Sequence, residues 1–144
     1  MISKTIKVGV MSKENYRKRT TSIAKGEYQP RKGEPRIWFE SIKSMAQILS
    51  NENQNLLRTI IEYNPSSITE LESISHRKKA NLSRTLKTLE KFGIVELNKI
   101  RGKIIPRVKV TDFKVEFGLN YSSPIHLDSR APARKIPNRV AGGI

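Results

Sequence analysis

The side chains best suited to chemistry in this sequence lie between residues 77 and 91, where cations, amides and hydroxyls far outnumber acids. Arginine pairs well with guanine and asparagine with adenine in the major groove of DNA, and lysines reach phosphates. A solvated basic helix face is the alternative interpretation, so the neighbouring elements must decide between the two. The candidate DNA-contacting residues of this run are Arg77, Lys78, Lys79, Ala80, Asn81, Arg84, Thr85, Lys87 and Thr88.

The spacing of three leucines predicts that this run is a helix. Leu82, Leu86 and Leu89 fall at positions i, i+4 and i+7, which aligns them along one helical face. The polar candidates then lie on the opposite face, and Gly93 follows as a residue that ends helices.

A shorter helix is predicted just before it. Ser66 or Ser67 can cap this helix, with Glu70 as the acidic partner of a capping box and Pro65 ahead of the start. Its apolar positions recur every three residues at Ile68, Leu71 and Ile74.

A basic hairpin is predicted after the second helix. Two short apolar strands, 94–97 and 104–110, flank a turn at 99–103 that contains three cations and a glycine. Arg101 and Lys103 are the candidate DNA contacts at its tip. Pro106 suits an edge strand, and an edge hairpin kept soluble by lysines is the alternative interpretation.

The chain before this region supplies further elements. Residues 5–10 alternate apolar and polar side chains as a half-buried strand does, and residues 11–25 form a helix with Ser12 as its cap. The cluster 17–19 on that helix is cationic and can touch phosphates or form a solvated face. Residues 27–36, with two prolines and a glycine, form a loop or an arm.

Residues 38–63 supply the apolar scaffold. The apolar segment 38–49 contains a helix capped by Ser41, and residues 51–63 form the first helix of a three-helix core, capped by Ser50 or Asn51. The buried stripe of this helix is predicted to be Leu56, Leu57, Ile60 and Ile61.

The predicted fold is therefore α+β. It is a winged helix-turn-helix, a three-helix core plus a β-wing, with an N-terminal strand-helix extension and a flexible C-terminal tail. A last strand at 113–117 pairs either with strand 5–10 or with a second subunit. The predicted divisions are a basic extension at 1–37, the winged domain at 38–117 and a flexible basic tail at 118–144, rich in proline and glycine.

The run from Asn81 to Val95, NLSRTLKTLEKFGIV, resembles the recognition-helix signature of winged helix-turn-helix regulators of the MarR type. The wider pattern resembles the HVO_A0114 kind of prokaryotic DNA-binding regulator from about Lys4 to Phe117. The segments that carry this second resemblance are VGVMSKE at 8–14, AKGEY at 24–28, WFES at 38–41 and NEN at 51–53. The resemblance implies a DNA-binding transcriptional regulator, and an antitoxin role because such regulators often lie beside a small toxin.

Composition narrows the function classes. The net charge is +15 and the pI about 10.3, with the basic segments flanking a near-neutral stretch at 38–64, which favours nucleic acid as partner. The chain has no cysteine, and its two histidines, His76 and His126, lie far apart. We therefore expect no enzyme, no cofactor and no metal. The sequence carries no signal peptide or membrane-spanning run, so a cytoplasmic protein that does not bind membranes is expected.

The expected function is sequence-specific binding of double-stranded DNA by a transcriptional regulator that acts as a homodimeric repressor. An antitoxin that neutralises a small toxin protein and regulates its own operon is the alternative. RNA binding is a weaker third interpretation, because aromatic stacking platforms are scarce. Strands 5–10 and 113–117 and the apolar segment 38–49 are the expected material for a subunit interface.

Overall fold

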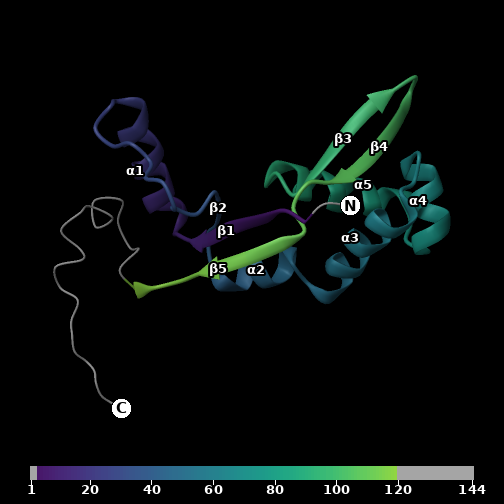
Figure 1. The fold of residues 1–144 in the computed structure, drawn as a ribbon, viewed down its shortest axis with the longest axis horizontal. Coiled ribbons are helices and arrows are strands. Elements are labelled where there is room, and N and C mark those ends of the chain that lie inside the picture. The colour runs from purple at the N-terminus through teal and green to yellow at the C-terminus, as the bar shows by residue number, and fades with distance from the viewer. Residues whose placement is uncertain (1–2, 120–144) are drawn as a thin grey trace, which may run out of the picture.

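The computed structural model describes residues 3–119, and the predicted tail from residue 120 onward lies outside the described residues. The described part is an α+β fold with five helices, a three-stranded parallel sheet and a two-stranded hairpin (Figure 1). In chain order the elements are β1 (Thr5–Val10), α1 (Lys13–Ala24), β2 (Ile37–Phe39), α2 (Ile42–Ile48), α3 (Asn51–Tyr63), α4 (Ile68–Ser75), α5 (Lys79–Lys91), β3 (Val95–Ile100), β4 (Lys103–Val108) and β5 (Asp112–Glu116).

Serine side chains fix where four of the helices begin. The hydroxyl oxygens of Ser12, Ser41, Ser50 and Ser67 each accept the backbone N–H three residues later, at 2.9 to 3.2 Å. Such a bond satisfies one of the backbone donors that a helix start leaves open. The predicted starts are confirmed, and the two open choices are resolved in favour of Ser50 and Ser67.

The parallel sheet has β1 at its centre and the strand order β2-β1-β5. The last strand therefore pairs with the N-terminal strand, which was one of the two predicted alternatives, with Val8 opposite Val115. Strand β2 was not predicted: Ile37 was assigned to the N-terminal extension, and Trp38 and Phe39 to the apolar segment that contains α2. Helix α1 makes the crossover from β1 to β2, as a parallel pair of strands requires.

Gly9 allows the chain after α1 to close against β1. A Cβ atom at this position would lie 2.6 Å from Trp38 Cζ3 and 2.8 Å from Pro35 Cγ, closer than carbon atoms can approach. Gly9 is also the register partner of Trp38. Because residue 9 has no side chain, the Trp38 indole and the Pro35 ring can pack against the central strand.

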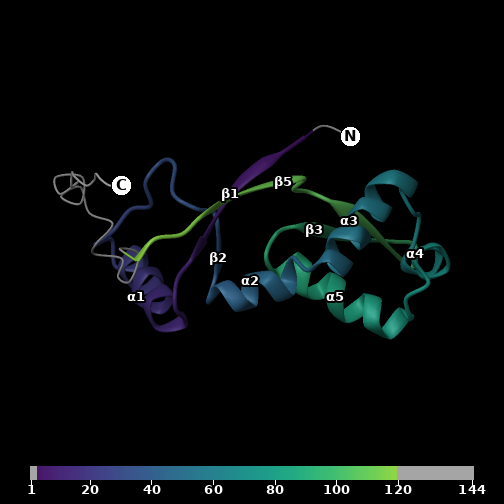
Figure 2. The ribbon, with the colours of Figure 1, turned by 90° about the horizontal axis from the view of Figure 1, so that it is seen from below.

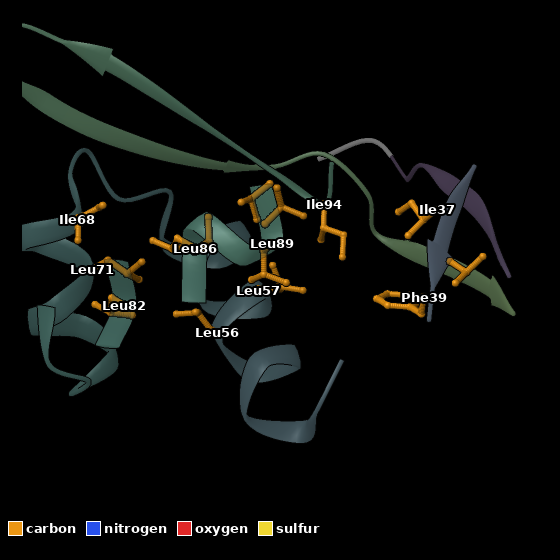
Figure 3. Close-up of a cluster of buried hydrophobic side chains, with 14 residues drawn as sticks. Ile37, Phe39, Leu56, Leu57, Ile68, Leu71, Leu82, Leu86, Leu89 and Ile94 are labelled. Atoms are coloured by element: carbon orange, nitrogen blue, oxygen red, sulfur yellow. The ribbon is translucent and has the colours of Figure 1, made fainter. Parts of the chain in front are cut away.

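One hydrophobic core connects the sheet to the helices (Figure 3). Leu82, Leu86 and Leu89 are fully buried on the inner face of α5, as their spacing predicted. Phe39 stacks on Phe92 with ring centroids 4.7 Å apart, which joins β2 to the end of α5. The core cluster consists of Val8, Ile37, Phe39, Leu56, Leu57, Ile60, Ile68, Leu71, Leu82, Leu86, Leu89, Ile94, Val95 and Val108.

Two side chains lie elsewhere than the sequence predicted. Ile61 was expected in the buried stripe of α3 but is 38% exposed, because it falls beside rather than on the face formed by Leu57 and Ile60. Arg19 was expected at the surface with its basic neighbours, but it is buried at 8% exposure, because Glu34 from the following loop pairs with it.

The segments expected to join two subunits pair largely within the chain. Strand β1 has neighbours on both edges, and Val8, Ile37 and Phe39 belong to the core. Part of the apolar surface stays open: Val115 and Phe117 remain about half exposed. Within residues 3–119, no helix is long and apolar enough to cross a membrane.

Candidate functional site

Helices α4 and α5 are joined by a tight turn that spans residues 76–78. His76 adopts a left-handed conformation, φ 61°, and its backbone N–H donates to Glu72 O at 3.0 Å, which ends α4. The start of α5 has no side-chain cap of its own at Lys78. Instead, Glu72 Oε2 accepts the Lys79 backbone N–H at 3.1 Å, so a carboxylate from α4 caps α5.

The outer face of α5 is polar and exposed, as predicted. This face lies opposite the buried leucines, and its carboxyl-terminal turn carries one further cation, Lys91. Thr88 Oγ1 donates to the Arg84 carbonyl oxygen at 3.1 Å, so this hydroxyl is bonded to its own helix. Arg84 itself is exposed. The exposed predicted residues on α5 are Lys79, Ala80, Asn81, Arg84, Lys87 and Thr88.

Arg77, in the turn before α5, lies along one flank of this face. Its Nε and Nη2 donate to Asn81 Oδ1 at 3.0 and 2.7 Å, and Nη2 also donates to Thr85 Oγ1 at 3.2 Å. The guanidinium therefore fixes the orientation of the Asn81 amide. A bidentate contact with adenine needs both Oδ1 and Nδ2, so in this arrangement Asn81 offers chiefly its N–H donors.

The paired strands reach further towards the tip than predicted and the turn is tighter, while the second strand ends at Val108 rather than at residue 110. Strand β3 runs to Ile100 and β4 starts at Lys103, which leaves Arg101 and Gly102 as a two-residue turn. Both have positive φ, 51° and 78°, as the commonest two-residue hairpin turns require. The cations Lys99, Arg101 and Lys103 at this end are exposed.

The structure brings the hairpin tip beside the first turns of α4 and α5. A surface hollow of about 360 Å³ is lined by Lys79 and Ser83 from α5, by the first residues of α4 and by Gly102 and Lys103. Two of the predicted cations, Lys79 and Lys103, therefore share one hollow. Lys87 and Thr88, further along α5, do not line it. Ser83 was not among the predicted residues, although its place between Lys79 and Lys87 on one flank was a usable signal.

Arg107, which was not among the predicted residues, holds the hairpin in place, and Glu70, the predicted acidic partner of the capping box, closes the start of α4. Arg107 Nη1 donates to the Pro65 carbonyl oxygen at 3.0 Å and joins β4 to the start of α4. Glu70 Oε1 accepts the Ser66 N–H at 2.7 Å and the Ser66 hydroxyl at 2.8 Å. These two bonds lower the pKa of Glu70 below its ordinary value, and the charge of Lys103 lowers it further.

Residues 48–115 match the family model HVO_A0114. The predicted resemblance to HVO_A0114 is thereby confirmed over this segment, which runs from the end of α2 into β5. The curated proteins gave no match, and neither did the solved structures.

The HVO_A0114 segment contains the whole candidate surface: the turn, α5 and the hairpin. Among residues 3–119, no group of three histidine, cysteine or acidic side chains could hold a metal ion. The exposed residues of the turn, α5 and the hairpin supply hydrogen-bond donors and positive charge, which suit a polyanion.

Proposed function

We propose that this chain is a transcriptional regulator that binds duplex DNA in a sequence-specific manner, with α3, α4, α5 and the β3–β4 hairpin forming a winged helix-turn-helix of the MarR type. In this proposal α5 enters the major groove and the hairpin is the wing. The observation that carries it is the two-sided character of α5, whose inner face is buried by leucines while its outer face is cationic and exposed. The exposed donors on the outer face of α5 do not contribute to packing of the hydrophobic core.

The hairpin supports the proposal independently. Its tip carries Arg101 and Lys103 beside the first turn of α5, so both elements can meet one duplex. Arg84 and Asn81 would contact base edges in the major groove, while the lysines of α5 and of the hairpin neutralise phosphates. We further propose that the chain is a cytoplasmic repressor that acts as a homodimer. The antitoxin role stays a prediction of the resemblance alone.

A pair of alanine variants on α5 tests the proposal. Arg84→Ala removes an exposed donor, so specific DNA affinity should fall by about 1–3 kcal/mol with an unchanged melting temperature. Leu86→Ala creates a cavity at a fully buried site and should cost about 2–5 kcal/mol of folding free energy. Thermal melts and binding curves on a duplex selected from a random library separate the two effects. If the chain selects no sequence, or if Arg84→Ala binds as wild type does, the proposal is wrong.

A further inference from the structure

A second polar site lies at the other end of the molecule, around Arg19 on α1. Arg19 Nη2 donates to Glu34 Oε1 at 2.8 Å, and the two side chains are only 10% and 12% exposed. The Tyr28 hydroxyl donates to the other oxygen, Glu34 Oε2. Both oxygens of this carboxylate are therefore engaged by neighbours within the chain.

The Arg19 guanidinium also packs against two aromatic rings. Its central carbon lies 5.9 Å from the centre of the Tyr28 ring and 5.4 Å from the centre of the Trp38 ring. This geometry suits cation–π attraction. The Arg19 Nε–H is buried and has no acceptor in the described part of the chain. A buried donor without a partner is unfavourable.

The loop beside Arg19 is held at several points. Lys7 Nζ donates to the Gly33 carbonyl oxygen at 2.6 Å, and the Arg36 backbone N–H donates to Lys7 O at 2.9 Å. Glu34 N–H donates to Arg31 O at 3.1 Å within the loop. These bonds tie the loop to the central strand β1, so the site is formed before any ligand arrives.

The loop, α1 and Trp38 of β2 line an open surface hollow of about 470 Å³, a volume within the range of small-ligand sites. Four cationic side chains line it, Arg19, Arg31, Lys32 and Arg36, against the single carboxylate of Glu34, which Arg19 already neutralises. We propose that this hollow binds a phosphate group, either of a small phosphorylated molecule or of the DNA backbone. A phosphate carries the charge and the acceptor oxygens that this lining lacks.

The position of the hollow separates it from the proposed DNA-reading surface. Figures 1 and 2 both place α1 and β2 towards one end of the molecule and α4, α5 and the β3–β4 hairpin towards the other. The inference therefore goes beyond the proposed function and does not depend on it. It would give the chain a second anion-binding site within the segment that precedes the HVO_A0114 match.

The fluorescence of Trp38 offers a direct test, because this residue lines the hollow and is the only tryptophan of the chain. The full-length chain is titrated with ribose 5-phosphate, inorganic phosphate and a short DNA duplex. Ribose and sodium chloride at matched ionic strength serve as controls. We expect a saturable change in Trp38 emission with a phosphate-bearing probe and none with ribose or salt.

Two double variants with equal loss of charge separate the site from general electrostatics. Lys32→Gln with Arg36→Gln removes exposed cations of the lining and should weaken phosphate affinity about ten-fold or more. Arg17→Gln with Lys25→Gln removes exposed cations of the α1 region outside the lining and should leave affinity within about two-fold. Equal thermal melts show that both variants remain folded.

The probes identify the source of the phosphate. A response to ribose 5-phosphate supports a small phosphorylated ligand, and a response to the duplex alone supports a backbone phosphate. Silence with every probe overturns the inference, and so does equal weakening in the two double variants. The Arg84→Ala variant measures duplex binding separately. If no phosphate binds in the hollow, the proposed DNA binding therefore still stands, and if the chain does not bind DNA, the hollow can still bind phosphate.

Discussion

At the scale of single residues, the pairing of Arg77 with Asn81 decides which hydrogen-bonding groups the outer face of α5 presents. Two guanidinium N–H groups occupy the Asn81 carbonyl oxygen, and a third bond reaches Thr85. The sequence alone predicts a DNA contact for Arg77 and another for Asn81. Arg77 lies in the turn before α5 rather than on the helix, so helical spacing alone did not reveal its contact with Asn81.

A double-mutant cycle tests whether Arg77 acts through Asn81. Asn81→Ala and Arg77→Ala should each lower the preference for the selected duplex over random DNA, by about 1–3 kcal/mol. If Arg77 orients the amide, the double variant should lose little more than Asn81→Ala alone. Arg77→Lys keeps the charge without the planar fork and should behave as Arg77→Ala in selectivity. Additive losses, with Arg77→Lys restoring selectivity, would instead make Arg77 a separate phosphate contact.

At the scale of elements, the sequence predicted the helices well and the sheet poorly. The starts of α1, α2, α3 and α4 follow from serine caps, which are local signals. The parallel pairing of β1 with β2 and β5 joins segments distant in sequence, with no turn to mark it. Strand β2 is three residues long, too short for a periodic pattern. The turn of the hairpin is tighter than predicted for a related reason, because the positive φ of Arg101 leaves no periodic pattern in the sequence.

For the candidate surface formed by the 76–78 turn, α5 and the hairpin, the sequence likewise predicted one part and missed another. The leucine stripe predicted which side chains of α5 face outward, and their exposure agrees. The bonds that hold the surface in place were beyond prediction, since Glu72 caps α5 from α4, and Arg107 joins Pro65 across 42 positions. Such contacts depend on tertiary packing rather than on periodicity.

Glu70 at the start of α4 makes a pH-dependent contribution to stability. Its bonds to Ser66 favour the carboxylate, so the pKa of Glu70 in the folded chain lies below its ordinary value of 4.5. A lowered pKa gives a stabilisation that is complete above the ordinary value and is lost as the pH falls through the folded value. Glu70→Gln should therefore unfold at lower urea concentration than wild type at pH 7, with a difference that shrinks below pH 4.5.

The matched control for this prediction is Glu62→Gln, an exposed acid at the end of α3. It should leave the pH profile of urea unfolding close to that of wild type. A gap between wild type and Glu70→Gln that stays constant from pH 7 down to pH 3 would show that the Ser66 bonds do not depend on ionisation.

At the scale of the whole molecule, the proposed function predicts a homodimer. One recognition helix reads only a few base pairs, too few to single out one site in a genome. Two copies on a symmetric operator, with half-sites about 34 Å apart or a multiple of that, provide the discrimination. Light scattering should give about twice the mass of the 16.4 kDa chain, and footprints should be two-fold symmetric. A monomer that protects one asymmetric site would rule out this assembly.

In the proposed function, α5 and the hairpin together neutralise DNA phosphates. The salt dependence of duplex binding tests this most directly. Each phosphate contact adds about 0.9 to the slope of log affinity against log salt concentration. Wild type should show a steep slope, and Arg101→Gln with Lys103→Gln should reduce it by about 1 to 2 at an unchanged melting temperature. Lys25→Gln with Lys43→Gln, exposed cations outside this surface, should leave the slope as in wild type. Binding that ignores salt, or equal slopes in the two double variants, would contradict the account.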